Sequence, residues 1–464
     1  MVHRSRTRAG RLVRPAHLLL PALTAFAAAS LAAPAGAQPF YGSGHPEVAA
    51  AVQQSARSGG KSVRAFYEAR RYRPLWIRGN GFGPEADYLF ELVASADLDG
   101  VDRGRLRPAR LAQALDRAQR GSPKALAAAE LLLSETFAEY VQAMRRTRGA
   151  GMHIETEALL PAVPTDQAAL EAAASARSLD QYLRSFGWMH PYYAGLRNAL
   201  ANPILDQQNA ERLRLNLERV RALPAGNQGR YILVDTAAAQ LYMYENGQVR
   251  DTMRVVVGKS DQQTPMMAGF IRYAILNPYW NIPPDLVATK VAPGVAKQGA
   301  AYLKANRYQI LSDWSETPTV LASTKVDWRA VLAGREELRV RQLPGPGNGM
   351  GNVKFMFPND LGIYLHDTPD KQLMRRASRQ FSSGCVRLED AARLGRWLYG
   401  KPLVASSSAP EQKVQLPEPV PVYLTYLTAA PEAGRIAYRP DTYGRDRAEL
   451  AAAVAVQGRM RGTR

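Results

Sequence analysis

A cysteine and a histidine offer the clearest chemistry in this sequence. Cys385 is the only cysteine among 464 residues, so it cannot form a disulfide within the chain. His366 lies upstream of it, in a short run with the alternating pattern of a strand. A thiol is a strong nucleophile once a base has removed its proton, and a nearby histidine suits that role. The pair therefore predicts a cysteine nucleophile with a histidine base.

A purely structural interpretation of the same pair stands beside this one. A lone cysteine is often a small apolar residue of the core, and a histidine can be a satisfied structural side chain. The neighbours of Cys385 are small and polar, Ser382-Ser383-Gly384 on one side and Arg387 on the other. Such neighbours argue against deep burial of the thiol, so the chemical interpretation is favoured.

The residues around the pair predict how a site would be built. Alternation places Tyr364 and His366 on one face of a strand and two aliphatic residues on the other, so Tyr364 and His366 would line a cleft. Amides of Ser383-Gly384-Cys385, just ahead of a predicted helix at Leu388–Leu398, would stabilise a thiolate and an oxyanion. Arg387 would face the same side and pair with a substrate carboxylate.

Other motifs that could bind metals or phosphates are incomplete. The run 97–102 resembles a calcium loop but lacks required ligand positions, so it predicts a turn. The run Gly345–Gly351 lacks the Lys-Ser/Thr of a phosphate loop and predicts a flexible loop. One cysteine and scattered histidines predict no zinc site, and we expect neither metal nor cofactor. The remaining histidines are His3, His17, His45, His153 and His190.

The chain is strongly basic, with 60 Lys+Arg against 41 Asp+Glu and a formal charge of +19. A basic surface suits polyanions in general. The basic residues are scattered and accompany no nucleic-acid-binding motif, so we expect no nucleic-acid partner. An anionic cell envelope is the favoured partner.

Residues 1–37 have the pattern of a secretory signal. Arginines precede an apolar run from about Ala16 to Ala33, and Ala35-Gly36-Ala37 fits a cleavage site. An uncleaved membrane anchor is the alternative, but the run is short and contains Pro21. We expect an exported protein with no stable membrane insertion once the signal is removed.

The patterns downstream predict an α+β protein, with an N-terminal all-α domain followed by a β-rich domain. The expected parts are a flexible lead-in (38–59), a helical scaffold domain (60–204), a catalytic domain (205–445) and a C-terminal helix or tail (446–464). Strands are expected in the catalytic domain, including a hairpin turning at Asn246-Gly247. An irregular insertion at 283–333 predicts a lid. A Ser/Pro-rich connector is expected at Ala405–Pro421.

Together these motifs resemble the L,D-transpeptidases of the YkuD superfamily, and most of all their large YcbB-type branch. The family signature is a histidine followed at a limited distance by Ser/Thr-x-Gly-Cys. Here 15 residues separate His366 from Ser382-Ser383-Gly384-Cys385-Val386-Arg387. The resemblance is strong over about residues 205–445 and weaker over 60–200. It continues through Phe66–Arg70, Pro74-Leu75-Trp76, Asn216–Arg219, Val255–Lys259, Gln263-Thr264-Pro265, Asn277–Pro283, Val353–Asn359, His366–Pro369 and Tyr438–Asp441.

Two departures from the family pattern are visible. Ser383 stands where the superfamily often has histidine, in a position that is neither nucleophile nor base. The branch usually carries a small peptidoglycan-binding module before the catalytic domain. Here Leu196–Leu200 runs almost directly into Asn209–Arg221, which leaves no room for that module.

The resemblance implies a cysteine acyl transfer on peptidoglycan. His366, oriented by a backbone carbonyl near Asp367, takes the proton of Cys385. The thiolate attacks the amide between the third residue and the terminal D-Ala of a tetrapeptide stem, and D-Ala leaves. A meso-diaminopimelate amine of a second stem then gives a 3→3 cross-link. The implied oxyanion donors are backbone groups at Ser383, Gly384 and Cys385, and the implied substrate-binding residues are Arg387, Tyr364, Ser382 and Trp280.

The resemblance further implies a periplasmic enzyme of cell-wall organisation and cell shape, a carbapenem target, with other cell-wall synthesis proteins as possible partners. Three alternatives stay open. The acceptor is water in an L,D-carboxypeptidase, and an envelope protein in an attaching transpeptidase. In the third alternative the protein binds the wall without catalysis, and Cys385 is structural.

Overall fold

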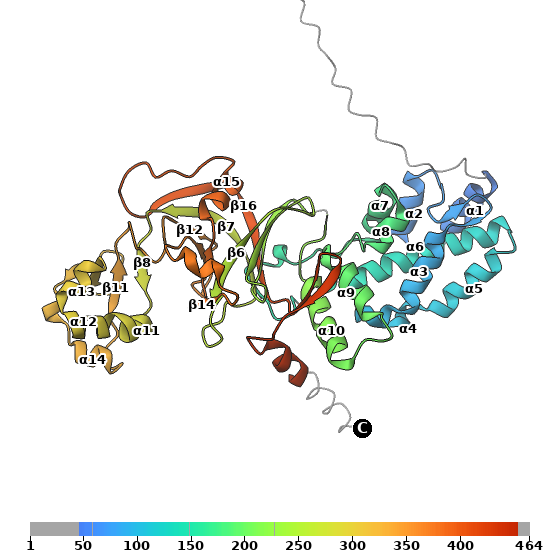
Figure 1. The fold of residues 1–464 in the computed structure, drawn as a ribbon. Coiled ribbons are helices and arrows are strands. Elements are labelled where there is room, and N and C mark those ends of the chain that lie inside the picture. The colour runs from blue at the N-terminus through green and yellow to red at the C-terminus, as the bar shows by residue number, and fades with distance from the viewer. Residues whose placement is uncertain (1–45, 58, 148, 227, 453–464) are drawn as a thin grey trace, which may run out of the picture. The chain divides into compact units, whose positions relative to one another are not determined.

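The computed structural model describes residues 46–452 except residues 58, 148 and 227 (Figure 1). The predicted export signal at 1–37 lies outside the described residues, as does the end of the predicted C-terminal helix. Residues 446–452 of that predicted helix are helical. Among the described helices, none is both long and apolar enough to cross a membrane.

The first part of the described chain is helical, as the apolar periods predicted. Its longest helix is α6, which starts after Ser122 with Pro123 at its first position, where the missing N–H of proline costs no helix hydrogen bond. The side chains of Phe137, Tyr140 and Val141 on α6 are buried in the core that the shorter helices share. These elements are α1 (Pro46–Ala56), α2 (Lys61–Ala69), α3 (Pro84–Ala94), α4 (Arg103–Leu106), α5 (Pro108–Ala118), α6 (Pro123–Arg145), α7 (Asp166–Ser175), α8 (Leu179–Arg184), α9 (Tyr192–Leu200) and α10 (Gln207–Arg221).

The run 97–102 contributes a buried carboxylate to this helical core. Asp99 ends a short 3-10 helix, η1 (Ala96–Asp99). Its carboxylate accepts hydrogen bonds from the hydroxyls of Tyr140 (2.7 Å) and Tyr193 (3.0 Å) and pairs with Arg197 (3.2 Å). These partners, all on helices, satisfy the buried charge. Over the described residues, no group of three or more potential metal ligands lies together.

The second part is built on a ten-stranded sheet in the order β12-β13-β15-β6-β5-β4-β16-β7-β3, with β14 beside β6. Because β12 also pairs with β7, the path of strands closes on itself. The strands are β3 (His153–Ile154), β4 (Arg230–Asp235), β5 (Gln240–Glu245), β6 (Gln248–Gly258), β7 (Met267–Leu276), β12 (Val353–Met356), β13 (Leu365–His366), β14 (Gln380–Ser382), β15 (Val386–Leu388) and β16 (Gln412–Thr425). The predicted α+β class is confirmed.

The hairpin predicted at Asn246-Gly247 is confirmed, whereas the predicted connector is partly wrong. Asn246 (φ 50°) and Gly247 (φ 73°) both adopt positive φ, as the predicted type I′ turn requires. The connector predicted over Ala405–Pro421 is wrong in its second half, because β16 already begins at Gln412. The prolines mark an interruption within that strand, where the pairing with β7 shifts register between Gln415 and Val420.

The insertion predicted as an irregular lid is a folded unit with its own sheet and core. Its strands follow the order β10-β9-β11-β8, and its apolar residues form a separate cluster. Leu276 at the end of β7 and Val353 at the start of β12 are register partners, so the chain leaves and re-enters the main sheet at one point. The elements are β8 (Trp280–Ile282), α11 (Pro284–Leu286), the π-helical η3 (Val287–Val291), α12 (Ala292–Gln298), α13 (Ala300–Ala305), β9 (Tyr308–Leu311), β10 (Val320–Leu321), η4 (Ser323–Lys325), α14 (Trp328–Leu332) and β11 (Arg339–Gln342).

Candidate active site

Two neighbouring parallel strands, β13 and β15, bring the predicted chemical residues together. Leu365 pairs with Val386 and His366 with Arg387. The Leu365 and Val386 side chains are fully buried in the core of the sheet. Alternation therefore turns His366 and Arg387 to the other face, together with Cys385, which directly precedes β15. The predicted division of this segment into a core face and a cleft face is what the structure shows.

His366 is held in the tautomer that a general base needs. Its Nδ1 lies 2.6 Å from the backbone carbonyl of Asp367. A carbonyl only accepts hydrogen bonds, so Nδ1 carries the hydrogen and the Nε2 lone pair is left to accept a proton. The side chain is 2% exposed. Burial, with a smaller effect from the positive charge of Arg387, lowers the pKa of His366 to about 3, so the imidazole is neutral near pH 7.

The surroundings of Cys385 favour the thiol over the thiolate. Its Sγ donates a long hydrogen bond of 3.6 Å to the carbonyl of Gly362. Burial raises the pKa of Cys385, while hydrogen bonding to Tyr364 and the charge of Arg387 act in the opposite direction. Cys385 and His366 line the same cleft, and attack by a neutral thiol requires its proton to pass to a base.

The predicted contribution of a helix N-terminus to the thiolate is wrong. The segment after Cys385 is strand β15, and helix α15 (Ala391–Tyr399) begins only beyond it, with Asp390 as its N-cap. Leu388 is committed to the sheet because it pairs with Val255 of β6. Helix-end effects fall off within one turn, so the amides of α15 are too far along the chain to act on the sulfur.

The nucleophile loop, defined here as Ser382–Cys385, is closed by its own hydrogen bonds. The buried Ser382 hydroxyl donates to the carbonyl of Cys385 (2.6 Å) and accepts from the N–H of Gly384 (3.3 Å). Gly384 has φ +110°, and a Cβ there would lie 3.1 Å from the Ile363 side chain. The loop therefore requires glycine at this position. Ser383 is exposed beside it.

Two basic side chains flank the imidazole. Arg387 lies opposite His366 on β15, and Lys354 lies opposite it on β12. Each has an acidic neighbour, Asp370 at 3.7 Å from Arg387 and Glu411 at 3.4 Å from Lys354. The Arg387 pair is loose, and its Nε is buried without a hydrogen-bond partner among the described residues. This side of the site is therefore suited to an anionic ligand.

A cleft of about 240 Å³ lies over these residues, between the main sheet and the insertion. Every predicted substrate-binding residue lines it. The wall on the nucleophile side is made by Tyr364, His366, Pro369, Asp370, Ser382, Ser383, Cys385 and Arg387. The opposite wall is made by Trp280, Pro283, Leu286, Lys290, Asn306, Tyr308, Gln342, Gly347, Gly349 and Met350.

Sequence reasoning missed part of the second wall. The glycine-rich run 345–351 is anchored rather than free, because the buried Asn348 donates to the carbonyls of Pro278 and Leu343. Lys290 extends over the Trp280 ring, with Nζ 5.6 Å from the ring centroid. An asparagine within a glycine-rich run was an available signal for the loop, whereas nothing local distinguishes Lys290 from the other lysines.

The arrangement defines a cysteine–histidine site on a β-rich domain, and the comparison with known families agrees with that class. Residues 229–417 match the family of the L,D-transpeptidase catalytic domain, YkuD, and residues 61–200 match a family described as a scaffold domain. Residues 229–417 are therefore an L,D-transpeptidase catalytic domain of the YkuD family, and the predicted resemblance to that family is confirmed.

The chain is similar to a putative L,D-transpeptidase of Haemophilus influenzae. The two are 27% identical over 396 residues, which is 82% of this chain and 77% of the relative.

Two solved structures share 13% identity with 42% of this chain. One is an L,D-transpeptidase from Mycobacterium smegmatis (58% of that chain, TM-score 0.21). The other is an L,D-transpeptidase of Enterococcus faecium (50% of that chain, TM-score 0.18). The chain spans little more than half the length of these proteins, and TM-scores of this size are too low to compare the folds.

Proposed function

We propose that the protein forms 3→3 cross-links in peptidoglycan through a thioester on Cys385, acting outside the cytoplasm. The observation that carries the proposal is the cleft face shared by Cys385, His366 and Arg387. It combines a nucleophile, a base whose tautomer is fixed by the Asp367 carbonyl, and a cation for an anionic stem peptide. Membership of the L,D-transpeptidase catalytic-domain family supports peptidoglycan as the substrate class.

In the first half-reaction, Nε2 of His366 accepts the thiol proton as Sγ of Cys385 attacks the carbonyl carbon before the terminal D-Ala. The negative charge that develops on the carbonyl oxygen is stabilised by N–H groups of the nucleophile loop. When the intermediate collapses, the C–N bond breaks and the imidazolium returns its proton to the departing D-Ala amine. The products are a thioester and free D-Ala, and the base is regenerated.

In the second half-reaction, an amine of meso-diaminopimelate from another stem attacks the thioester carbon. His366 takes a proton from this amine, and the C–S bond breaks as the amide forms. The thiolate regains its proton from the imidazolium. The neutral imidazole near pH 7 suits both steps, because each begins with the removal of a proton by Nε2.

Binding of the donor stem is assigned to the two walls of the cleft. Arg387 contacts a carboxylate of the stem on the nucleophile side, beside Tyr364. Trp280 and Lys290 provide an aromatic surface and a second cation on the insertion side. The folded insertion then acts as the lid that covers the bound peptide.

The decisive experiment uses purified protein and purified tetrapeptide muropeptides, with products separated and identified by mass spectrometry. Dimers with a 3→3 link, together with released D-Ala, are the expected result. Tripeptides without dimers would show an L,D-carboxypeptidase with water as acceptor. An unchanged substrate with a folded protein that still binds peptidoglycan would show a non-enzymatic wall-binding protein.

Two further measurements test the role of the thiol. The Cys385→Ala variant is expected to fold normally, keep its binding to peptidoglycan and lose all product formation. A carbapenem is expected to acylate the native protein, giving a mass increase located on the peptide that contains Cys385. Product formation by Cys385→Ala would contradict the mechanism.

A further inference from the structure

Thr264 is a buried residue that contacts the nucleophile loop from outside the cleft. Its side chain is fully buried, and its hydroxyl donates to the carbonyl of Gly384 at 2.7 Å. The same oxygen accepts from the N–H of Gly258 at 2.9 Å. The peptide group that joins Gly384 to Cys385 is planar, so fixing its carbonyl also fixes the direction of the Cys385 N–H. Thr264 therefore sets the orientation of one of the oxyanion donors.

The loop that carries Thr264, residues 258–264, is held at both ends by the C-terminal part of the chain. The Tyr443 hydroxyl donates to the carbonyl of Gly258 at 2.6 Å. Arg445 Nη2 donates to the carbonyl of Thr264 at 2.8 Å, and its Nε donates to Oε1 of Gln263 at 3.2 Å. Gln263 Nε2 in turn donates to the carbonyl of Tyr443 at 2.9 Å. The side chains of Tyr443 and Arg445 thus hydrogen-bond to this loop at its two ends.

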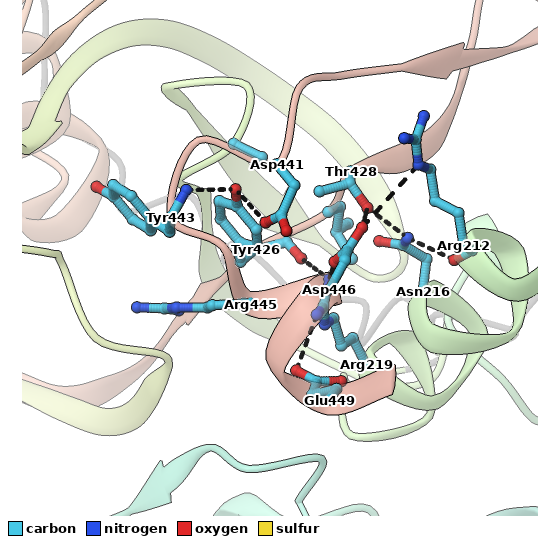
Figure 2. Close-up of polar contacts among 12 residues, drawn as sticks. Arg212, Asn216, Arg219, Tyr426, Thr428, Asp441, Tyr443, Arg445, Asp446 and Glu449 are labelled. Carbon is cyan, nitrogen blue, oxygen red and sulfur yellow. Dashed lines mark hydrogen bonds and ion pairs between the residues drawn. The ribbon is translucent and has the colours of Figure 1, made fainter. Parts of the chain in front are cut away.

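The C-terminal strap, defined here as residues 441–449, is anchored to helix α10 (Figure 2). The anchor is Arg219, whose side chain is fully buried. It pairs with Asp446 at 2.7 Å and Glu449 at 2.8 Å and donates to the carbonyl of Tyr426 at 3.0 Å. The second carboxylate oxygen of Asp446 accepts from the Thr428 hydroxyl at 2.6 Å. A buried charge with this many partners fixes the strap in one position.

Stacking fixes the two side chains that contact the loop. The Tyr443 ring lies parallel to that of Tyr426, with centroids 5.1 Å apart and planes 9° apart. The Arg445 guanidinium lies over both rings, at 5.3 Å from Tyr426 and 5.1 Å from Tyr443 (Figure 2). The Tyr426 hydroxyl also accepts from the N–H of Tyr443 at 3.0 Å. Tyr443 and Arg445 are therefore held rigidly where they meet the loop.

These contacts form a continuous path from α10 through the strap and residues 258–264 to the nucleophile loop. We propose that Tyr443 and Arg445 are positioning residues, which act through Thr264 to orient the Gly384–Cys385 peptide for catalysis. The proposal rests on the proposed function in that Cys385 is taken as the nucleophile. Neither residue lines the cleft, so neither is expected to contact a substrate bound there.

The test compares variants that remove single hydroxyls without changing shape. Thr264→Val removes the donor to Gly384, and Tyr443→Phe removes the donor to Gly258 while keeping the ring stack. Tyr399→Phe is the matched control, because the Tyr399 hydroxyl donates to a backbone carbonyl, that of Val414, at 2.8 Å away from the nucleophile loop. Thr264→Ser keeps the hydroxyl and is the rescue variant.

Three readouts are compared: kcat and KM for dimer formation, the rate of Cys385 alkylation by iodoacetamide from pH 6 to 10, and the thermal midpoint. We expect Thr264→Val and Tyr443→Phe to lower kcat by about tenfold, with KM within about twofold. A misdirected N–H donor stabilises the transition state less well but leaves the binding of the substrate in its ground state unchanged. Both variants should alter the alkylation profile in the same direction. Thr264→Ser and Tyr399→Phe should match the native enzyme.

The double variant Thr264→Val/Tyr443→Phe decides whether Tyr443 acts through Thr264. If it does, the double variant is no slower than Thr264→Val alone. Additive losses, or a Tyr443→Phe enzyme that matches Tyr399→Phe in kcat and alkylation, would overturn the proposal, whatever the thermal midpoints show. The alkylation comparison does not require turnover. If the native protein makes no cross-link, the proposed function is wrong. The alkylation rates of the variants still test the positioning proposal in that case.

Discussion

His366 and Arg387 occupy paired positions on the parallel strands β13 and β15, so the base and a cation of the cleft are fixed by one pair of strands. The positive charge of Arg387 disfavours the imidazolium, and burial disfavours it further. A substrate carboxylate at Arg387 would offset that charge. Binding of an anionic stem peptide would then strengthen the base at the moment when a proton has to be accepted.

The first prediction concerns Arg387 and the protonation of His366. In Arg387→Gln the pKa of His366 should rise, because one of the groups that lowers it has been removed, although burial will still keep it below 6.5. The change can be followed from the imidazole signals in an NMR titration. KM for the tetrapeptide should rise as well. An unchanged His366 titration would show that burial alone sets the pKa.

The second prediction concerns the resting state of Cys385. Because burial raises the thiol pKa, alkylation by iodoacetamide should continue to accelerate as the pH rises past about 8.5, the ordinary value for cysteine. Mass spectrometry of the Cys385 peptide gives the rate, and Cys385→Ala is the blank. A rate that levels off below pH 7 would instead indicate a preformed thiolate–imidazolium pair.

The third prediction concerns the backbone of the nucleophile loop. Gly384→Ala places a side chain at φ +110° and 3.1 Å from Ile363, so it should lower the free energy of unfolding by about 1–3 kcal/mol and abolish most activity. Gly434→Ala is the control, with a φ of +78° in the hairpin of β17 (Ala429–Glu432) and β18 (Arg435–Tyr438) and open space around it. The control should lose stability but keep its kcat.

The fourth prediction concerns stability in acid. His190 is fully buried, its Nδ1 accepts from the N–H of Tyr192, and its pKa is lowered to about 3 by burial. In the unfolded chain the His190 imidazole is protonated below about pH 6.5. In the native state it stays neutral down to about pH 3. Stability should therefore fall through this window, by about 2 kcal/mol from His190 between pH 7 and pH 5.

Denaturant titrations at several pH values measure this dependence. In His190→Asn the side-chain oxygen replaces the acceptor for Tyr192 without titrating, so the stability of the variant should fall less steeply between pH 7 and pH 5. His153→Asn, which replaces an exposed histidine, is the matched control. Equal slopes for the native protein and His190→Asn would contradict the prediction.

The fifth prediction concerns the insertion side of the cleft. Lys290→Gln should raise KM for the tetrapeptide about tenfold with little change in kcat, because it removes a binding charge that does not touch the reacting atoms. Lys297→Gln removes an exposed lysine of the same insertion that does not line the cleft, and it should have no effect. A fall in kcat with unchanged KM in Lys290→Gln would place Lys290 nearer the chemistry than proposed.

Local patterns were enough to predict the helical character of the N-terminal part, the first hairpin and the two faces of the strand that carries His366. Side-chain direction in a strand or helix repeats with a fixed period, so it is visible in a single segment. The same reasoning failed after Cys385, where a helix was predicted to begin at Leu388. That residue belongs to strand β15, and the helix begins only at Ala391. Pairing of Leu388 with Val255 decides that segment, and such a contact is distant in sequence.

The strap contacts were beyond sequence reasoning for a related reason. Tyr443 and Arg445 bind backbone carbonyls of residues 258–264, and every residue has a carbonyl, so no side-chain pattern identifies the partner. The anchoring of the run 345–351 by Asn348 was missed in the same way. In both places the sequence shows the residue type, an aromatic residue or a glycine-rich run, but it does not show which backbone carbonyl accepts the hydrogen bond.

Because Leu276 pairs with Val353, we expect that the insertion can be exchanged for another segment. The chain departs for the insertion and returns from it at two residues that are already joined within the main sheet, and the insertion has a core of its own. A shorter, longer or unrelated segment grafted between these two residues would leave the strands that carry Cys385 and His366 in register. Such a graft would change the insertion wall of the cleft while the positions of Cys385 and His366 stay fixed.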